Sequence, residues 1–192
     1  MIAEKLFTPA SGCRLIQCTN QNILSGQPPE VLKGVLRSGI SEFHTLVLLG
    51  SKEKDGSLIN NIEFSLYYFL FPLILASNPS KIITSKNIFN MGMEKLACGL
   101  DWDEAVIREH FRFTEITPGH QLNYYGLPID PHSAVHSIPT LDATFTSRHR
   151  GLERTICTIG NNHSQTNIAR LNEQGIVSDD TRANRKPSAQ PF

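Results

Sequence analysis

Two stretches of the chain place polar, metal-capable side chains at the end of an apolar segment. The first is Ala134-Val135-His136-Ser137-Ile138-Pro139-Thr140, which carries an imidazole. The second is the apolar run Thr155–Ile159, which leads into Gly160-Asn161-Asn162-His163-Ser164. Imidazole is a common ligand of divalent metals, and a bound divalent metal makes hydroxide from water near neutral pH. Metal-dependent hydrolysis is therefore the chemistry that these residue types would support.

Other catalytic chemistries find little support. Ser137 beside His136 is not a triad, because adjacent strand residues point to opposite faces. The chain has no Gly-x-Ser-x-Gly elbow, no Gly-x-Gly-x-x-Gly fingerprint and no Walker loop. The four cysteines are irregularly spaced and form no Cys-x-x-Cys unit. They are typical of buried or partly buried free thiols in a reducing compartment.

The composition excludes some partners. The 192 residues carry 18 basic and 18 acidic side chains, so the average charge attracts neither long nucleic acid nor an anionic membrane. Arg148, Arg150 and Arg154 fall close together, and we expect them in a solvated loop. The start of the chain lacks a signal-peptide pattern, and the apolar stretch Phe64–Leu75 is too short to span a bilayer. We expect a cytoplasmic protein.

Amphipathic periodicity predicts five helices. Thr84 or Ser85 is expected to cap the third helix, and Gly99 to stop it. Asp101 and Glu104 form a candidate capping box for the fourth. The five predicted helices cover residues 28–38, 57–71, 85–98, 103–110 and 164–174.

Short apolar runs predict the strands. Thr45–Leu49 and Lys81–Thr84 are uninterrupted, as in strands covered on both faces. From Phe111 onward the period changes to two, and the predicted strands are 111–115, 122–124, 127–129, 135–138 and 155–159. Residues 1–27 are only weakly periodic. The order of elements predicts an α/β or α+β sandwich with strands between helical layers, and residues 179–192 read as a poorly ordered tail.

The second half of the chain resembles a known family. Phe113-Thr114-Glu115-Ile116-Thr117-Pro118-Gly119, then Tyr125-Gly126-Leu127-Pro128-Ile129, then Val135-His136-Ser137-Ile138-Pro139-Thr140 carry the resemblance. These runs are similar to metallo-β-lactamase-fold hydrolases, in the branch of ribonuclease Z-like and cyclic-nucleotide phosphodiesterase-like enzymes. The resemblance covers roughly residues 30–180. It implies an α/β fold, a shortened αββα sandwich of metallo-β-lactamase type, as a single domain over residues 1–178.

The resemblance also implies a dinuclear metal site, in which this sequence departs from the family pattern. The family's first ligands, His-x-His-x-Asp-His, belong in the loop Gly50–Gly56, which here has two lysines and no histidine. Asp55 is the one remnant in that loop. His136 matches a later histidine ligand of the family. Asn161 stands where the family has a bridging aspartate, and its neutral amide cannot bridge two cations.

Three hypotheses follow. The first is a divergent member with a degenerate metal site and no resident cofactor. It would serve as a non-catalytic subunit, regulator or binding module for a protein partner, a second copy of the chain, or a nucleotide or phosphoester. The second is an active phosphodiesterase-type hydrolase with zinc or another divalent metal, in which His136 and Asn161 would be metal ligands and Asp55 and His163 catalytic residues. The third is a structural subunit of a larger complex, docking through the apolar helix around residues 58–75.

Overall fold

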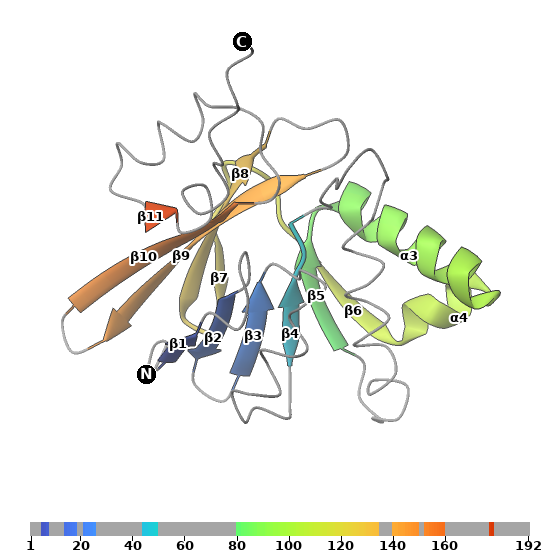
Figure 1. Cartoon of the computed structure of the whole chain (residues 1–192), viewed down its shortest axis with the longest axis horizontal. Helices are drawn as coiled ribbons and strands as arrows, with labels where there is room; N and C mark the ends of the chain where they lie inside the picture. The colour runs from blue at the N-terminus through green and yellow to red at the C-terminus, as the bar shows by residue number, and fades with distance from the viewer. Residues whose placement is uncertain are drawn as a thin grey trace, which may run out of the picture.

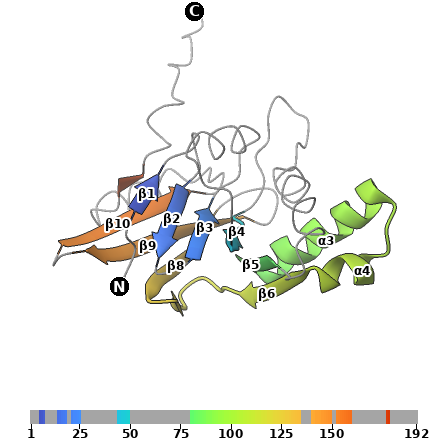
Figure 2. The ribbon, with the colours of Figure 1, turned by 90° about the horizontal axis from the view of Figure 1, so that it is seen from below.

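The computed structural model describes residues 5–7, 14–18, 21–25, 44–49, 80–134, 140–149, 152–159 and 177–178. These residues form two β-sheets that lie against each other, with two helices beside one end of the first sheet (Figures 1 and 2). The first sheet has the order β1 (Lys5–Phe7), β2 (Arg14–Cys18), β3 (Gln21–Ser25), β4 (Thr45–Val47), β5 (Ser80–Thr84), β6 (Phe111–Glu115). The second has the order β11 (Val177–Ser178), β10 (Leu152–Ile159), β9 (Leu141–His149), β8 (Leu127–Ser133), β7 (Leu122–Tyr124). The predicted α/β class is confirmed.

The weakly periodic beginning of the chain supplies half of the first sheet. Strands β1, β2 and β3 pair antiparallel, and Ile16 of β2 lies opposite Ile23 of β3. Both side chains are buried, as are Leu15 and Leu24 beside them. The sequence shows only two-residue apolar pieces here, too short for a periodicity. The structure adds these strands to those predicted.

The second half of the first sheet is parallel, and its strand β4 is buried on both faces. Strand β3 pairs parallel with β4, β4 with β5, and β5 with β6. The two predicted apolar strands, β4 and β5, are confirmed. Helix α3 (Lys86–Leu100) lies next to this region, and its Phe89 ring stacks on Phe113 of β6, with centroids 4.3 Å apart.

The helix ends differ from those predicted. The Ser85 hydroxyl accepts a hydrogen bond from the Ile88 amide, which confirms the start of α3. The helix continues through Gly99, and Asp101 takes the left-handed conformation that ends it (φ 54°). Asp101 is therefore not part of a capping box. Asp103 instead caps α4 (Glu104–Glu109), its Oδ1 accepting from the Ala105 amide at 2.7 Å.

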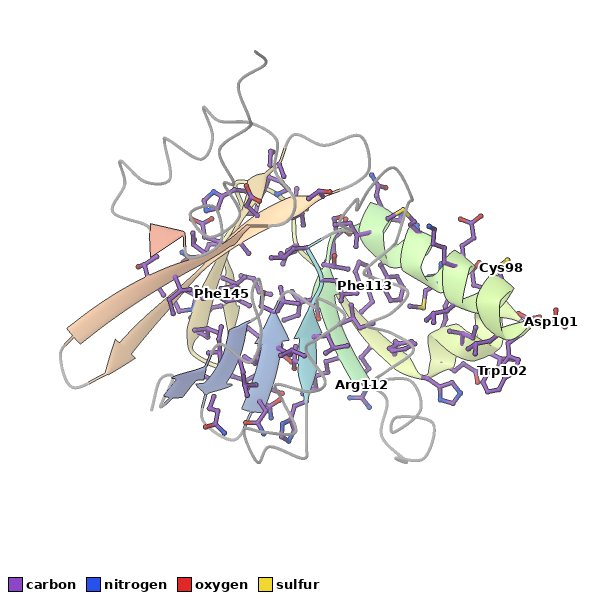
Figure 3. The ribbon with its side chains drawn as sticks, viewed as in Figure 1. Cys98, Asp101, Trp102, Arg112, Phe113 and Phe145 are labelled. Carbon is purple, nitrogen blue, oxygen red and sulfur yellow. The ribbon has the colours of Figure 1, made fainter. Side chains whose placement is uncertain are left out.

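The second sheet contains a strand that the sequence did not reveal. Strand β9 pairs along its length with β8 and β10, and its Phe145 lies opposite Ile129 and Ile156 (Figure 3). Arg148 belongs to β9 and Arg154 to β10, so these two residues lie in strands and not in the expected loop. Arg150 lies outside the described residues. His132, expected in a turn, lies in β8. In β9, apolar residues alternate with Asp142, Thr144 and Thr146, which weakens the apolar signal.

Several further predictions can be compared with the structure. Cys18 is buried and free, whereas Cys98 is exposed, contrary to expectation. The predicted helices at 28–38, 57–71 and 164–174, the strand at 135–138 and the tail lie outside the described residues. Among the helices that are described, none is long and apolar enough to cross a membrane.

Candidate functional site

The carboxyl ends of parallel strands gather at one edge of the first sheet. Because β3, β4, β5 and β6 run parallel, their carboxyl ends point the same way, upward in Figure 1. Ligands of α/β proteins commonly bind beyond the carboxyl ends of such strands. The histidine-free loop 50–56 follows directly after Leu49, the last described residue beyond β4. The first candidate segment therefore leaves the sheet at this edge.

A hydrogen bond links this edge to the residue that follows the His136 segment 134–140. The amide of Leu141, the first residue of β9, donates to the carbonyl oxygen of Leu49 over 2.7 Å. Leu141 comes five residues after His136, and Thr140 between them is buried. The end of the His136 segment is thus fixed to the start of the loop that contains Asp55.

The third candidate segment starts from the same corner. Ile159, the last residue of β10, pairs with Asp142 of β9, the residue after Leu141. Asn161 and His163 follow Ile159 by two and four residues. The chain positions flanking all three segments that the sequence singled out are therefore neighbours, although those segments are far apart in sequence.

Hydrogen bonds within the first sheet stiffen this corner. The buried Thr84 hydroxyl donates to the Leu48 carbonyl oxygen at 2.6 Å, and the Leu48 amide donates to Ile83. The Ile116 amide in turn donates to the Thr84 carbonyl oxygen at 2.9 Å. These bonds join the exits of β4, β5 and β6. A buried, hydrogen-bonded frame of this kind is what a preorganised site needs.

Asp142 is a carboxylate at this corner that was not among the site residues predicted from the sequence. Its residue is fully buried, and it lies opposite His132 of β8 as well as Ile159 of β10. Burying a carboxylate is costly, so acids in such positions take part in an interaction or in function. The signal in the sequence was the alternation of Asp142 with Ala143 and Phe145. This alternation indicates a strand, but it is weak without knowledge of the strands that pair with β9.

The four predicted site residues, Asp55, His136, Asn161 and His163, lie outside the described residues. Within the described part of the chain, no group of three or more histidine, cysteine, aspartate or glutamate side chains is placed to hold a metal ion. The described structure therefore defines where the three candidate segments are anchored. The roles of the four predicted site residues stay predictions.

Two of the described histidines, His44 and His132, have a side-chain contact with a described residue. His44 lies at the entry of β4, as predicted, and its Nδ1 accepts from the Asn22 amide at 3.0 Å. The His132 Nε2 lies 3.3 Å from the Thr144 hydroxyl. His120 is exposed, as expected, and His110 follows the end of α4.

Comparison with known proteins identifies the fold. No family model matches the sequence, and no curated protein matches it by sequence. Among solved structures, the metallo-β-lactamase fold protein YhfI from Bacillus subtilis matches with a TM-score of 0.56 and 14% identity, over 84% of this chain and 59% of that one. The native FEZ-1 metallo-β-lactamase from Legionella gormanii matches with a TM-score of 0.51 and 12% identity, over 81% and 60%.

The chain therefore has the metallo-β-lactamase fold, and the predicted fold class is confirmed. It spans about three fifths of the length of these two structures. At these identities the likeness concerns the fold alone. Activity has to be argued from the residues of this chain.

Proposed function

We propose that the chain is a divergent metallo-β-lactamase-fold protein with a degenerate metal site, acting as a non-catalytic subunit, regulator or ligand-binding module. The observation that carries the proposal is the Leu49–Leu141 hydrogen bond at the corner where β4, β9 and β10 meet. Three segments leave from that corner, and their sequences are poor in metal ligands.

The charges of the first segment support a site without metal. The loop 50–56, which follows β4 in the sequence, contains Lys52 and Lys54, where the family pattern has histidines. Ammonium groups repel divalent cations, and Asn161 has no charge to offset the repulsion. A loop that contains two lysines instead favours an anionic ligand or an acidic partner surface.

Metal analysis of the purified chain tests the proposal. The chain is expressed with zinc, manganese or iron supplied in turn, dialysed, and measured by inductively coupled plasma mass spectrometry. We expect less than one tightly bound ion per chain. Two tightly bound ions per chain would refute the degenerate site.

One observation favours the alternative, an active metal-dependent phosphodiesterase-type hydrolase. Asp142 is a buried carboxylate at the same corner, and a carboxylate is a negatively charged ligand of the kind that Asn161 cannot be. A mononuclear site would then combine Asp142 with His136 and Asn161 as metal ligands, with Asp55 and His163 beside it as catalytic residues.

Turnover of a generic phosphodiester separates the two proposals. The alternative expects hydrolysis of bis(4-nitrophenyl) phosphate that a chelator abolishes and that His136→Ala and Asp142→Asn both remove. Asp130→Asn, on the neighbouring strand β8, is the matched control and should retain activity. Absence of turnover with zinc, manganese, iron and magnesium would count against the enzyme.

A further inference from the structure

A polar cluster lies at the amino ends of the parallel strands of the first sheet, opposite the corner described above. Its core is the tight turn that joins β7 to β8, made by Tyr125 and Gly126 alone. Both residues have positive φ, 51° and 82°, as in a type I′ turn. The Asn123 side chain accepts from the Gly126 amide at 3.0 Å and holds the turn.

Tyrosine is an unusual residue for the first position of this turn. Asparagine, aspartate and glycine dominate there because other side chains crowd the backbone in the left-handed region. Strained residues of this kind concentrate at functional positions. Tyr125 is half exposed, so burial does not explain why a tyrosine occupies this turn position.

Docking of the hairpin does not explain Tyr125 either. The neighbouring Tyr124 already ties the hairpin to the first sheet, because its hydroxyl lies 2.7 Å from that of buried Thr45. The Cys18 thiol also donates to the backbone carbonyl of Tyr125, a contact that any residue could accept. The Tyr125 ring packs edge to face on the Tyr124 ring of the same hairpin, with centroids 4.7 Å apart. Its contact with the first sheet, from Lys81 Nζ to its hydroxyl at 2.7 Å, is exposed, and exposed contacts of this kind contribute little stability.

Two cations lie side by side on β5 and β6, and one of them, Lys81, contacts this tyrosine. Lys81 of β5 is directly opposite Arg112 of β6 in the register of the sheet, on strands about 4.8 Å apart. Like charges in directly opposed positions are unfavourable. Among the described residues, neither side chain forms an ion pair with an acid, and Arg112 is exposed at the lower end of the sheet (Figure 3). An anion would relieve the repulsion.

We propose that Lys81, Arg112 and Tyr125 form a binding site for a phosphate monoester that carries an aromatic ring, such as a nucleoside monophosphate. The two cations bind the phosphate oxygens, and the half-exposed Tyr125 ring stacks on the base. The Lys81 ammonium lies 4.8 Å from the centre of that ring, so the phosphate and base positions adjoin. This site is separate from the corner where β4, β9 and β10 meet and does not depend on a metal there.

Calorimetric titration of the whole chain at low ionic strength tests the site with three probes: adenosine 5′-monophosphate, inorganic phosphate and adenosine. We expect the nucleotide to bind about fivefold to a hundredfold more tightly than phosphate, from base stacking. Arg112→Gln and Lys81→Gln should each weaken nucleotide binding by about tenfold or more. Tyr125→Asn keeps a favoured turn residue, and should reduce nucleotide affinity to that of phosphate.

Arg108→Gln is the matched control. Arg108 forms an ion pair with Glu104 and a hydrogen bond with Asn90. Its replacement should leave nucleotide binding unchanged. Thermal melts confirm that each variant is folded. The proposal fails if the nucleotide does not bind, if it binds no better than inorganic phosphate, or if Arg108→Gln weakens binding as much as Arg112→Gln.

Discussion

The Leu141 amide and the Leu49 carbonyl oxygen form a 2.7 Å hydrogen bond between the two sheets of the fold. Leu49 precedes the loop that should carry the first metal ligands, and Leu141 follows the segment of His136. One backbone bond thus joins two parts of the chain that are distant in sequence. The residues that flank these two candidate segments are therefore neighbours, although the segments are far apart in sequence.

Thr84→Val tests how much the frame of this corner contributes to stability. The variant keeps the shape of the side chain but removes the buried hydrogen bond from Thr84 to the Leu48 carbonyl oxygen. We expect the free energy of unfolding to fall by about 1–3 kcal/mol, measured by urea denaturation. Thr84→Ser keeps the hydroxyl and should cost less. A larger loss for serine than for valine would show that methyl packing, rather than the hydrogen bond, holds the corner.

Asn161→Asp tests the proposed degenerate site. The substitution restores the carboxylate of the family pattern, but Lys52 and Lys54 remain in a loop that has no histidine. We expect the variant to bind no more metal than the original chain, measured by inductively coupled plasma mass spectrometry after incubation with zinc. Stable binding of two ions would mean that Asn161 alone prevents assembly of the site.

Elements with a strong, continuous pattern were predictable from the sequence. The apolar runs of β4 and β5 and the inward face of α3 have one plausible conformation each, and the structure contains all three. The resemblance carried by residues 113–140 led to the right fold for the same reason, because turn residues and strand residues alternate at short spacing there.

Elements that depend on distant partners were not predictable. Strands β2 and β3 have two-residue apolar pieces, which become core only when Ile16 meets Ile23. Strand β9 includes Asp142, whose burial depends on its place between β8 and β10. The polar cluster of Lys81, Arg112 and Tyr125 joins two sheets, and no local spacing relates its members. Sequence periodicity contains no information on such pairings.

Replacement of glycine by alanine should have opposite effects on stability at two positions, Gly99 and Gly119. Gly99 lies inside α3, where glycine costs about 0.5–1 kcal/mol relative to alanine. Gly119 has φ 83°, where alanine is strained although nothing lies within 4 Å of the added carbon. We therefore expect Gly99→Ala to raise the free energy of unfolding and Gly119→Ala to lower it, both measured by urea denaturation. Destabilisation by Gly99→Ala would indicate that α3 ends at Gly99, as the sequence predicted.

The contacts of the β7–β8 hairpin predict loss of stability at alkaline pH. Burial raises the pKa of Tyr124 above 10.0, and the hydrogen bond with Tyr125 raises the pKa of Lys81 above 10.5. Both groups hold their protons to higher pH in the folded chain than in the unfolded chain. Their contribution to stability is therefore complete below about pH 10 and is lost as the pH rises through the folded-state pKa values.

Tyr124→Phe isolates the tyrosine part of this effect. At pH 7 the variant should lose about 1 kcal/mol, because the hydrogen bond with Thr45 is gone. Between pH 9 and pH 11, roughly the range in which an unperturbed tyrosine titrates, its stability should fall less steeply than that of the original chain. Urea denaturation at each pH gives both curves, and their difference removes the contribution of the other lysines and tyrosines. Parallel curves would mean that the Tyr124 hydroxyl titrates equally in the folded and unfolded states.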